Sequence, residues 1–584
     1  MPNSDETGAV SADENTVTDN SASDDAHGMP DPAVVLVPKL DERFALSRSQ
    51  FVVLVGVCLF FMYYNYMRLF HSDFWGHVSY GTWILENERL PEQDMFLSHA
   101  EGVPVVATAW GAQVILGLIG RLGDDEYFSH LYAITVFLSF IVLGLTFRAQ
   151  SGSSRPALLA CGCVLIIWLS RHTVIRPEIF ALLCFAVTLL LTTLSDSRRT
   201  RDSCDALPLS SSQMAVHLIA IFALYFLWAN LHGSFFVGFA VLGAYALGRA
   251  IEVAWQGRDL LAAFADKVVQ QRMIAFWVAF AGTVLNPYLL DLHVYTLRFP
   301  MNRNLLDVEE WYSLDMTFME GPSMAFSWIL ACVLFRHSRR RILPADVILL
   351  LVFSTAVCMR VRMTQWYAPV AAFVLAPHIG DCYRQFVEWL EKGDSADFVT
   401  WMRYRSFRTS LIGLFIIWLT FCFSPVSRLV LGGAPRQPDH VYSADTPRGV
   451  TEYFRRNPPR GQVMNPQWWG DWLIWDGPEN IQAFMTTNAL HVTPATVWRD
   501  YMAMSRADAG FETLLTKYRV NTIVICKALQ QTLLREAPRM PGWETVFEDD
   551  TALVVARIGT LPPELEDDNG DDTLASSLTA ATGR

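Results

Sequence analysis

Long apolar segments recur between residues 50 and 428 and are separated by short polar ones. The hydrocarbon core of a bilayer is about 30 Å thick, so a spanning helix needs about 20 mostly apolar residues. The candidate spans lie roughly at 50–69, 129–147, 156–170, 175–195, 214–231, 233–252, 273–291, 322–336, 344–360, 363–379 and 409–428. Several are short, which allows for half-helices or kinked pairs. The pattern predicts an α-helical polytopic membrane protein with about eleven transmembrane helices.

Arginine and lysine concentrate in alternate connections between these segments, as the positive-inside rule describes for cytoplasmic loops. The basic residues of these loops are Arg148, Arg155, Arg198, Arg199, Arg201, Arg258, Lys267, Arg272, Arg336, Arg339, Arg340, Arg341, Arg384, Lys392, Arg403, Arg405 and Arg408. The bias predicts a cytoplasmic N-terminus and a first outer loop at 70–128. With an odd number of spans, it also places the region after residue 430 outside.

The C-terminal region, residues 440–560, alternates short apolar runs with helical periods. Strands are expected at 461–465, 472–475, 481–486, 522–526, 544–547 and 552–557. Helices are expected at 446–456, with Thr446 as N-cap, and at 495–518 and 528–536. This alternation predicts a C-terminal extracytoplasmic α/β domain.

Composition agrees with an integral membrane protein, because 52% of the 584 residues are hydrophobic and only 18% are charged. The net charge of −13 comes largely from two acidic tails. We expect disorder in residues 1–45 and 561–584, which flank a transmembrane domain at 46–430 and the α/β domain at 440–560. The first apolar run starts past residue 48 and lacks a small-residue cleavage site, so no cleavable signal peptide is expected. The arginine clusters are short and flank membrane helices, so no nucleic-acid partner is predicted.

The stretch from residue 70 to 110 follows the first apolar run and is rich in acids, histidines and tryptophans. A polar loop of about forty residues is long and is more often functional than filler. Asp73 follows the apolar run so closely that its carboxylate should lie at the membrane–water boundary. A second interpretation is that Asp73 caps a following helix, since Asp is a favoured N-cap residue.

Three motifs in this stretch resemble the first outer loop of bacterial GT-C-type glycosyltransferases: Asp73-Phe-Trp75-Gly-His77, Gly81-x-Trp83-Ile-Leu and Leu90-Pro91-x-x-Asp94-x-Phe96. The run from Trp468 to Trp475 resembles the C-terminal domains of the same family. These enzymes take sugars from polyprenyl-phosphate carriers. The resemblance implies a multi-pass protein of the inner (cytoplasmic) membrane, with Asp73 as catalytic carboxylate.

Other candidates surround this acid. His71, Asp73, His77 and Asp94 have the residue types of a divalent metal site, for Mg or Mn, that would neutralise a phosphate. The histidines do not share a helix face cleanly, and anchoring at the interface is the alternative for His77. His77 and Asp94 are also candidates for direct substrate contact.

Further substrate-binding candidates lie in outer loops or at the outer ends of spans: Arg176, His232, Glu310, Arg360 and Arg362. Arginine matches phosphate geometry bidentately, so the arginines could hold the carrier phosphate. The alternatives are lipid contacts or ion pairs for the arginines, a helix–helix hydrogen bond for His232 and a solvated position in the loop for Glu310. For the tryptophans at 468–475, packing is favoured over stacking on a sugar.

The sequence therefore predicts a membrane glycosyltransferase that moves a sugar from a polyprenyl-phosphate carrier to a saccharide, lipid or protein acceptor. Asp73 would be the general base of an inverting transfer. The alternative is a non-catalytic membrane scaffold, or a transporter, that binds lipid-linked saccharides. No internal repeat is evident, which disfavours a symmetric transporter.

Overall fold

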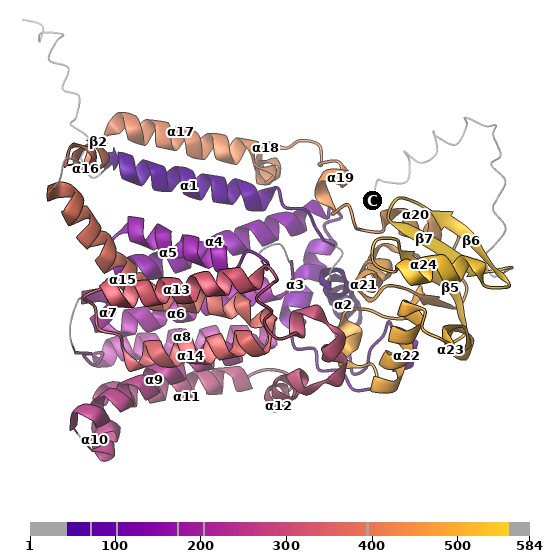
Figure 1. Ribbon diagram of the computed structural model, residues 1–584, viewed down its shortest axis with the longest axis horizontal. Helices are drawn as coiled ribbons and strands as arrows, with labels where there is room; N and C mark the ends of the chain where they lie inside the picture. Colours follow the sequence, from indigo (N-terminus) through magenta and orange to yellow (C-terminus); the bar gives the residue numbers. More distant parts are fainter. Residues whose placement is uncertain are drawn as a thin grey trace, which may run out of the picture.

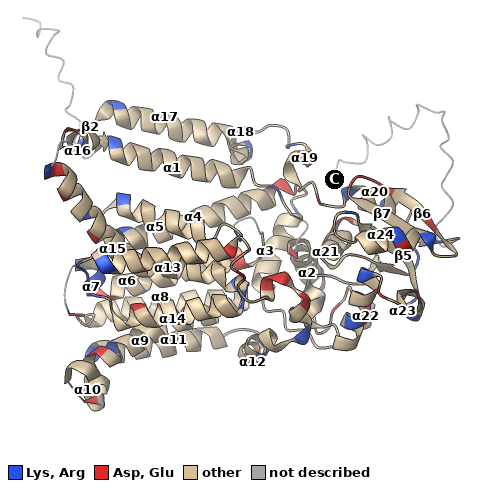
Figure 2. Ribbon diagram, in the orientation of Figure 1, with Lys and Arg blue, Asp and Glu red and all other residues tan. Residues whose placement is uncertain are grey.

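The computed structural model describes residues 44–70, 73–100, 103–171, 175–201, 205–257, 259–392 and 396–559. The two tails with predicted disorder, apart from residues 44 and 45, lie outside the described residues. A bundle of long helices forms one end of the molecule, and a mixed α/β domain forms the other (Figure 1). Charged residues lie mostly at the helix ends and over the α/β domain, whereas the middle of the bundle has few (Figure 2). This distribution fits a bundle whose middle lies in hydrocarbon.

Each predicted apolar segment contains a helix. Their bounds are α1 Arg48–Asn65, α4 Glu126–Ser151, α5 Ser154–Ile167, α6 Glu178–Ser195, α8 Ser211–Leu231, α9 Phe236–Gly257, α11 Lys267–Val284, α13 Glu320–His337, α14 Pro344–Met359, α15 Thr364–Lys392 and α17 Phe407–Phe423. Within the described residues, five helices are long and apolar enough to cross a membrane. There are six if α17 and the bent segment 425–431 together form one span. The polytopic helical fold is thus supported, and the number of about eleven spans stays a prediction.

Helix α15 lies in the interior of the bundle and packs against α4, α5, α13 and α14. Its first eighteen residues, Thr364 to Asp381, are buried. The helix continues through Pro369 and Pro377, although proline removes a backbone donor. At the periphery, α1 pairs with α17, and the short strands β1 Leu46–Ser47 and β2 Arg405–Ser406 join their starts. Both helices expose large apolar side chains, as lipid-facing helices do.

The first outer loop is not the irregular segment of about forty residues that the sequence predicted. Helix α2 Phe74–Asn87 occupies its first part, and a second helix, α3 Trp110–Gly120, follows later in the same loop. The two helices pack closely because Gly81 and Gly117 bring their backbones together. Gly81 makes α2 less apolar in sequence, but its small size is what allows α2 to pack against α3.

The C-terminal domain is built on a five-stranded sheet of order β4-β3-β5-β7-β6. The strands are β3 Gln462–Met464, β4 Gln482–Ala483, β5 Val520–Cys526, β6 Trp543–Glu548 and β7 Ala552–Arg557. β3 pairs in parallel with β4 and β5, and β7 pairs antiparallel with β5 and β6. The predicted α/β domain is confirmed.

Three local predictions for this domain were wrong. The segment 472–475 is not a strand but part of helix α21 Gln467–Asp476, because its tryptophans follow a helical and not an alternating pattern. The helix expected at 495–518 is two helices, α22 Ala495–Arg506 and α23 Phe511–Lys517, since Ala507 and Gly510 adopt left-handed backbone angles between them. Helix α20 Arg448–Arg456 has Pro447, not Thr446, at its N-cap.

The remaining helices are short connections. They are α7 Ser197–Arg201, α10 Leu260–Ala265, α12 Asp291–Arg298, α16 Ala396–Arg403, α18 Arg428–Leu431, α19 Pro438–Val441 and α24 Gln531–Glu536. Two of the short 3-10 helices are η6 Glu309–Trp311, which contains Glu310, and η7 Val361–Met363, which contains Arg362.

Candidate functional site

Asp73 lies at the start of α2, where the bundle meets the C-terminal domain. Asp73 occupies the N-cap position of α2, as the second interpretation expected, but its side chain makes no capping hydrogen bond. Instead, Asp73 Oδ1 lies 2.9 Å from Arg176 Nε, and only 16% of the Asp73 side chain is exposed. The carboxylate is thus held by a cation from the connection before α6, about a hundred residues away along the chain.

Glu310 joins the same cluster from η6. Its Oε2 lies 2.8 Å from Arg176 Nη1 and 3.0 Å from Arg171 Nη2, and its Oε1 lies 3.1 Å from Arg362 Nη1. Arg362 also pairs with Glu178 at 2.9 Å and lies over the ring of Trp311. Three arginines and three carboxylates therefore form one connected outer cluster: Asp73, Arg171, Arg176, Glu178, Glu310 and Arg362.

The two acids at the centre of the outer cluster are perturbed in opposite directions. Burial raises the pKa of Asp73, Arg176 partly opposes this shift, and Glu310 and Glu178 add to it. Burial also acts to raise the pKa of Glu310, but Arg176, Arg362 and Arg171 outweigh it and hold that pKa below its ordinary value. Glu310 is therefore the permanent anion of the cluster, and Asp73 is the carboxylate that accepts a proton more readily.

Some polar atoms of the cluster are buried without a hydrogen-bond partner among the described residues. They are Arg171 Nε, Arg176 Nε and Asp73 Oδ1. The Arg176–Asp73 pair is close enough for an ion pair but is not aligned as a hydrogen bond. Buried donors and acceptors without partners are costly, so such atoms in a cluster indicate a place for a ligand.

His77 lies one turn after Asp73 on the same face of α2, since residues four apart are neighbours on a helix. Its Nδ1 lies 3.0 Å from Gln113 Nε2 of α3. A cavity of about 40 Å³ opens beside it and is lined by His77, Tyr80, Asp94, Val105, Val106, Ala107, Thr108, Ala109, Gln113, Tyr295, Asn488 and Val492. The cavity therefore lies between the first outer loop, α12 and the C-terminal domain.

Asp94, which lines this cavity, has a structural role in the loop. It accepts a hydrogen bond from the Tyr80 hydroxyl and others from the backbone N–H groups of Phe96 and Leu97, at 2.8 and 2.9 Å. It is 6% exposed, and burial raises its pKa. These contacts fix the turn after α2 and use both carboxylate oxygens.

The predicted metal site is not assembled by the described residues. Among them, no three His, Cys, Asp or Glu side chains lie close enough together to hold a metal ion. His71, one of the four predicted ligands, lies outside the described residues.

The other predicted site residues separate into two groups. His232 is within electrostatic reach of Glu178, Arg362 and Arg176, and its Nδ1 lies 2.9 Å from Ser234 Oγ. Arg360 lies apart from the outer cluster: it donates to the carbonyl of Met359 and lines another cavity, of about 160 Å³, with Trp311. The structure thus brings together Asp73, Arg176, Glu310, Arg362 and the neighbouring His232, but not Arg360.

The sequence prediction did not include Arg171, Glu178 or Asp471 as site residues. The first two flank Arg176 within eight residues, so their proximity was a usable signal. Asp471 belongs to α21, and its Oδ1 lies against Gly76 on α2, where an added Cβ would be 2.0 Å away. Burial raises the pKa of Asp471 to about 7, Thr487 opposes this, and Asp73 adds to it. No sequence pattern relates residues so far apart.

The arrangement defines a class of protein: a polytopic helical bundle in which the segment after α1 presents a carboxylate beneath a C-terminal α/β domain. No family model matches the sequence, and no curated protein matches it. Among solved structures, the archaeal oligosaccharyltransferase AglB of Archaeoglobus fulgidus, in complex with an inhibitory peptide and a dolichol-phosphate, is similar. Its TM-score is 0.52 at 14% identity, over 83% of this chain and 70% of that one.

A second structure, the Archaeoglobus fulgidus oligosaccharyltransferase tethered to an acceptor peptide, has a TM-score of 0.49 at 14% identity. The match covers 81% of this chain and 68% of that one. The likeness to AglB shows a shared fold, that of the GT-C-type glycosyltransferases. It confirms, at the level of fold, the resemblance predicted from the first outer loop.

Proposed function

We propose that this protein is a membrane glycosyltransferase that transfers a glycosyl group from a polyprenyl-phosphate carrier to an acceptor at the outer face. The observation that carries the proposal is the position of Asp73. Its carboxylate is held by Arg176 within a buried cluster of three arginines, at the boundary between bundle and outer domain. The GT-C-type fold supports the same conclusion.

In the proposed reaction, Asp73 acts as general base. The acceptor hydroxyl attacks the anomeric carbon of the sugar while its proton moves to the Asp73 carboxylate. The bond between the anomeric carbon and the phosphate oxygen breaks, and the lipid phosphate leaves with the bonding electrons. The raised pKa of Asp73 suits this task, because a base whose pKa lies nearer the working pH accepts a proton more readily.

The arginines of the outer cluster would hold the carrier phosphate. Arg171 Nε is a buried donor without a hydrogen-bond partner among the described residues, so it can donate to a phosphate oxygen. Glu310 orients all three arginines in advance, which reduces the reorganisation needed when the leaving phosphate gains charge. Glu310 and Arg362 would therefore position the site, with His232 beside them.

The acceptor would approach from the cavity beside His77. This cavity is lined by α2 and α3 on one side and by Asn488 and Val492 of the C-terminal domain on the other. The domain would then help select the acceptor, whether saccharide, lipid or protein. The similar AglB structure holds an inhibitory peptide and a dolichol-phosphate, which are ligands of the two kinds that this arrangement would take.

The test uses purified protein in nanodiscs, with a panel of radiolabelled polyprenyl-phosphate sugars and candidate acceptors. Asp73→Asn should lower transfer by about 10²–10⁴-fold, the usual contribution of a general base, while leaving donor binding nearly unchanged. Arg176→Gln should weaken donor binding as well. Glu309→Gln is the matched control, because Glu309 is exposed and next to Glu310.

Undiminished transfer by a folded Asp73→Asn protein would remove Asp73 from the role of base. The alternative function is a membrane scaffold or transporter that binds lipid-linked saccharides. Donor binding without hydrolysis or transfer, with any sugar and acceptor in the panel, would favour that alternative.

A further inference from the structure

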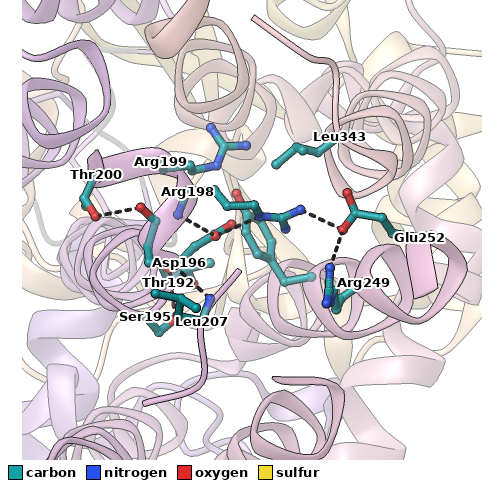
Figure 3. Close-up of polar contacts among 12 residues, drawn as sticks. Thr192, Ser195, Asp196, Arg198, Arg199, Thr200, Leu207, Arg249, Glu252 and Leu343 are labelled. Atoms are coloured by element: carbon teal, nitrogen blue, oxygen red, sulfur yellow. Dashed lines mark hydrogen bonds and ion pairs between the residues drawn. The ribbon is translucent and has the colours of Figure 1, made fainter. Parts of the chain in front are cut away.

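A second group of charged residues lies at the end of the bundle away from the C-terminal domain, near α7 (Figure 2). Arg198 and Arg249 both point toward the carboxylate of Glu252 on α9, and Asp196 faces Arg198 from below (Figure 3). The distances are 2.6 Å for Arg198–Glu252, 3.1 Å for Arg249–Glu252 and 3.2 Å for Arg198–Asp196. These pairs fix a wall of oriented guanidinium groups between α6, α7 and α9.

A cavity of about 330 Å³ opens above this wall. It is lined by Arg198, Arg199, Arg339, Arg340, Arg341, Leu343, Asp346, Pro377, Asp381 and Arg384. Its lining holds six arginines and two carboxylates, a formal excess of four positive charges. The outer cluster differs in this respect, because its three arginines are matched by three carboxylates.

The two carboxylates of the cavity are already engaged. Asp346 pairs with Arg199 and accepts a hydrogen bond from the backbone N–H of Leu343. Asp381 accepts from the N–H of Arg339 at 2.7 Å and from Arg384 at 3.2 Å. They have little capacity left to neutralise the remaining arginines.

Several arginines of the cavity are left without compensation. Among the described residues, the side chains of Arg339 and Arg341 have no ion-pair partner, and Arg199 Nε is buried with no hydrogen-bond partner. Burial is the main cause that lowers the pKa of Arg340; the charges of Arg384 and Arg199 lower it further, and Asp381 opposes them in part. Such a grouping of like charges is unfavourable unless an anion joins it.

We propose that this arginine pocket binds the phosphate group of an anionic ligand. Arginine forks match phosphate oxygens bidentately, and a cavity of this size can hold a phosphate with a small attached group. The positive-inside bias places this end of the bundle at the cytoplasmic surface, where anionic lipid head groups attract basic clusters. The phosphate could belong to a lipid head group or to a free phosphorylated molecule, and the experiment separates the two.

The test is native mass spectrometry of the purified full-length protein in neutral detergent, with phosphatidylglycerol, phosphatidylcholine or pyrophosphate added. The test variant is R339Q/R340Q/R341Q. The matched control is R336Q/R405Q/R408Q, which removes the same charge from exposed arginines on the same side of the bundle and outside the pocket. Arg341→Gln alone is measured beside them in case the triple variant is unstable.

Each basic residue near an anionic surface contributes about a fivefold factor in affinity, so the test variant should lose at least about tenfold in binding. The control should keep its binding. If the test variant loses binding of phosphatidylglycerol alone, the ligand is a lipid head group. If it loses binding of pyrophosphate, the ligand is a free phosphate. Equal losses in both triple variants, or binding of phosphatidylcholine as tight as that of phosphatidylglycerol, would overturn the proposal.

Discussion

At the scale of single residues, three aspartates around α2 show how different surroundings give one residue type different roles. Asp73 is paired with Arg176, Asp94 is saturated by Tyr80 and two backbone N–H groups, and Asp471 has one oxygen without a hydrogen-bond partner among the described residues. The sequence singled out Asp73 and Asp94 because both belong to loop motifs that resemble those of GT-C-type glycosyltransferases. It could not single out Asp471, which reaches the site only because α21 packs against Gly76.

Asp471 should make the stability of the protein depend on pH. Its pKa is raised from 3.8 to about 7 in the folded state, so the folded protein keeps a proton that the unfolded chain has lost. The free energy of unfolding should therefore fall as pH rises from about 4 to about 7 and then level off. Asp471→Asn removes this dependence and should stabilise the protein above pH 7 by roughly 1–4 kcal/mol, at about 1.4 kcal/mol per pKa unit.

The measurement is the apparent Tm in detergent across the pH range, followed by tryptophan fluorescence. Asp508→Asn serves as control, since Asp508 is exposed in the turn between α22 and α23. If the Asp471→Asn variant and the wild-type protein showed the same slope of Tm against pH, the assigned ionisation would be wrong.

At the scale of elements, α2 and α3 are the pair that presents the candidate site. Their closest approach is at Gly81, where an added Cβ would lie 1.8 Å from the carbonyl oxygen of Gln113, and at Gly117. Gln113 in turn contacts His77, so the helix spacing also sets the position of a site residue. The sequence offered α2 only as a helix that Asp73 would cap, because glycines and polar residues weaken the helical signal there.

Gly81→Ala should therefore separate the two helices. Its methyl group meets backbone atoms that have no alternative position, so we expect a destabilisation of about 1–3 kcal/mol, typical of overpacking. Transfer activity should fall together with stability, because His77 and Asp73 share α2. Thermal unfolding and the transfer assay measure the two effects.

Gly56→Ala on α1 is a suitable comparison, because an added Cβ there meets nothing within 4 Å. It should be neutral or slightly stabilising, as alanine is the better helix former. A Gly81→Ala protein as stable as the Gly56→Ala protein would show that α2 and α3 do not pack as described.

At the scale of the whole molecule, the C-terminal domain and the bundle share one aromatic core. Trp75 of α2 contacts Trp472 at 4.9 Å and stacks on Trp475 at 5.8 Å between ring centres. Trp472 is 2% exposed, which confirms the prediction that this tryptophan packs in a core rather than binding a sugar. The tryptophans of α21 thus form the interface that holds the C-terminal domain over the site.

Trp472→Ala should loosen this interface. Truncation of a buried tryptophan costs about 3–5 kcal/mol, so the domain should become sensitive to limited proteolysis near residues 430–445, and transfer should drop. Trp389→Ala is the control, because Trp389 is 68% exposed. If the Trp472→Ala protein resisted protease as well as the control variant, the tryptophan contacts would not be what holds the domain on the bundle.

The sequence alone determined the membrane class, the positions of the long helices, the α/β nature of the C-terminal domain and the choice of Asp73 as the first candidate. The first three features follow from local quantities, namely the length and the alternation of apolar runs, whereas the choice of Asp73 follows from the resemblance of its loop motif to GT-C-type glycosyltransferases. Only the tertiary structure decided that Arg171, Arg176 and Arg362 share Glu310, that Arg360 lies apart, and that Asp471 faces Gly76. Each of these depends on which helix faces meet, and the packing of distant segments fixes that.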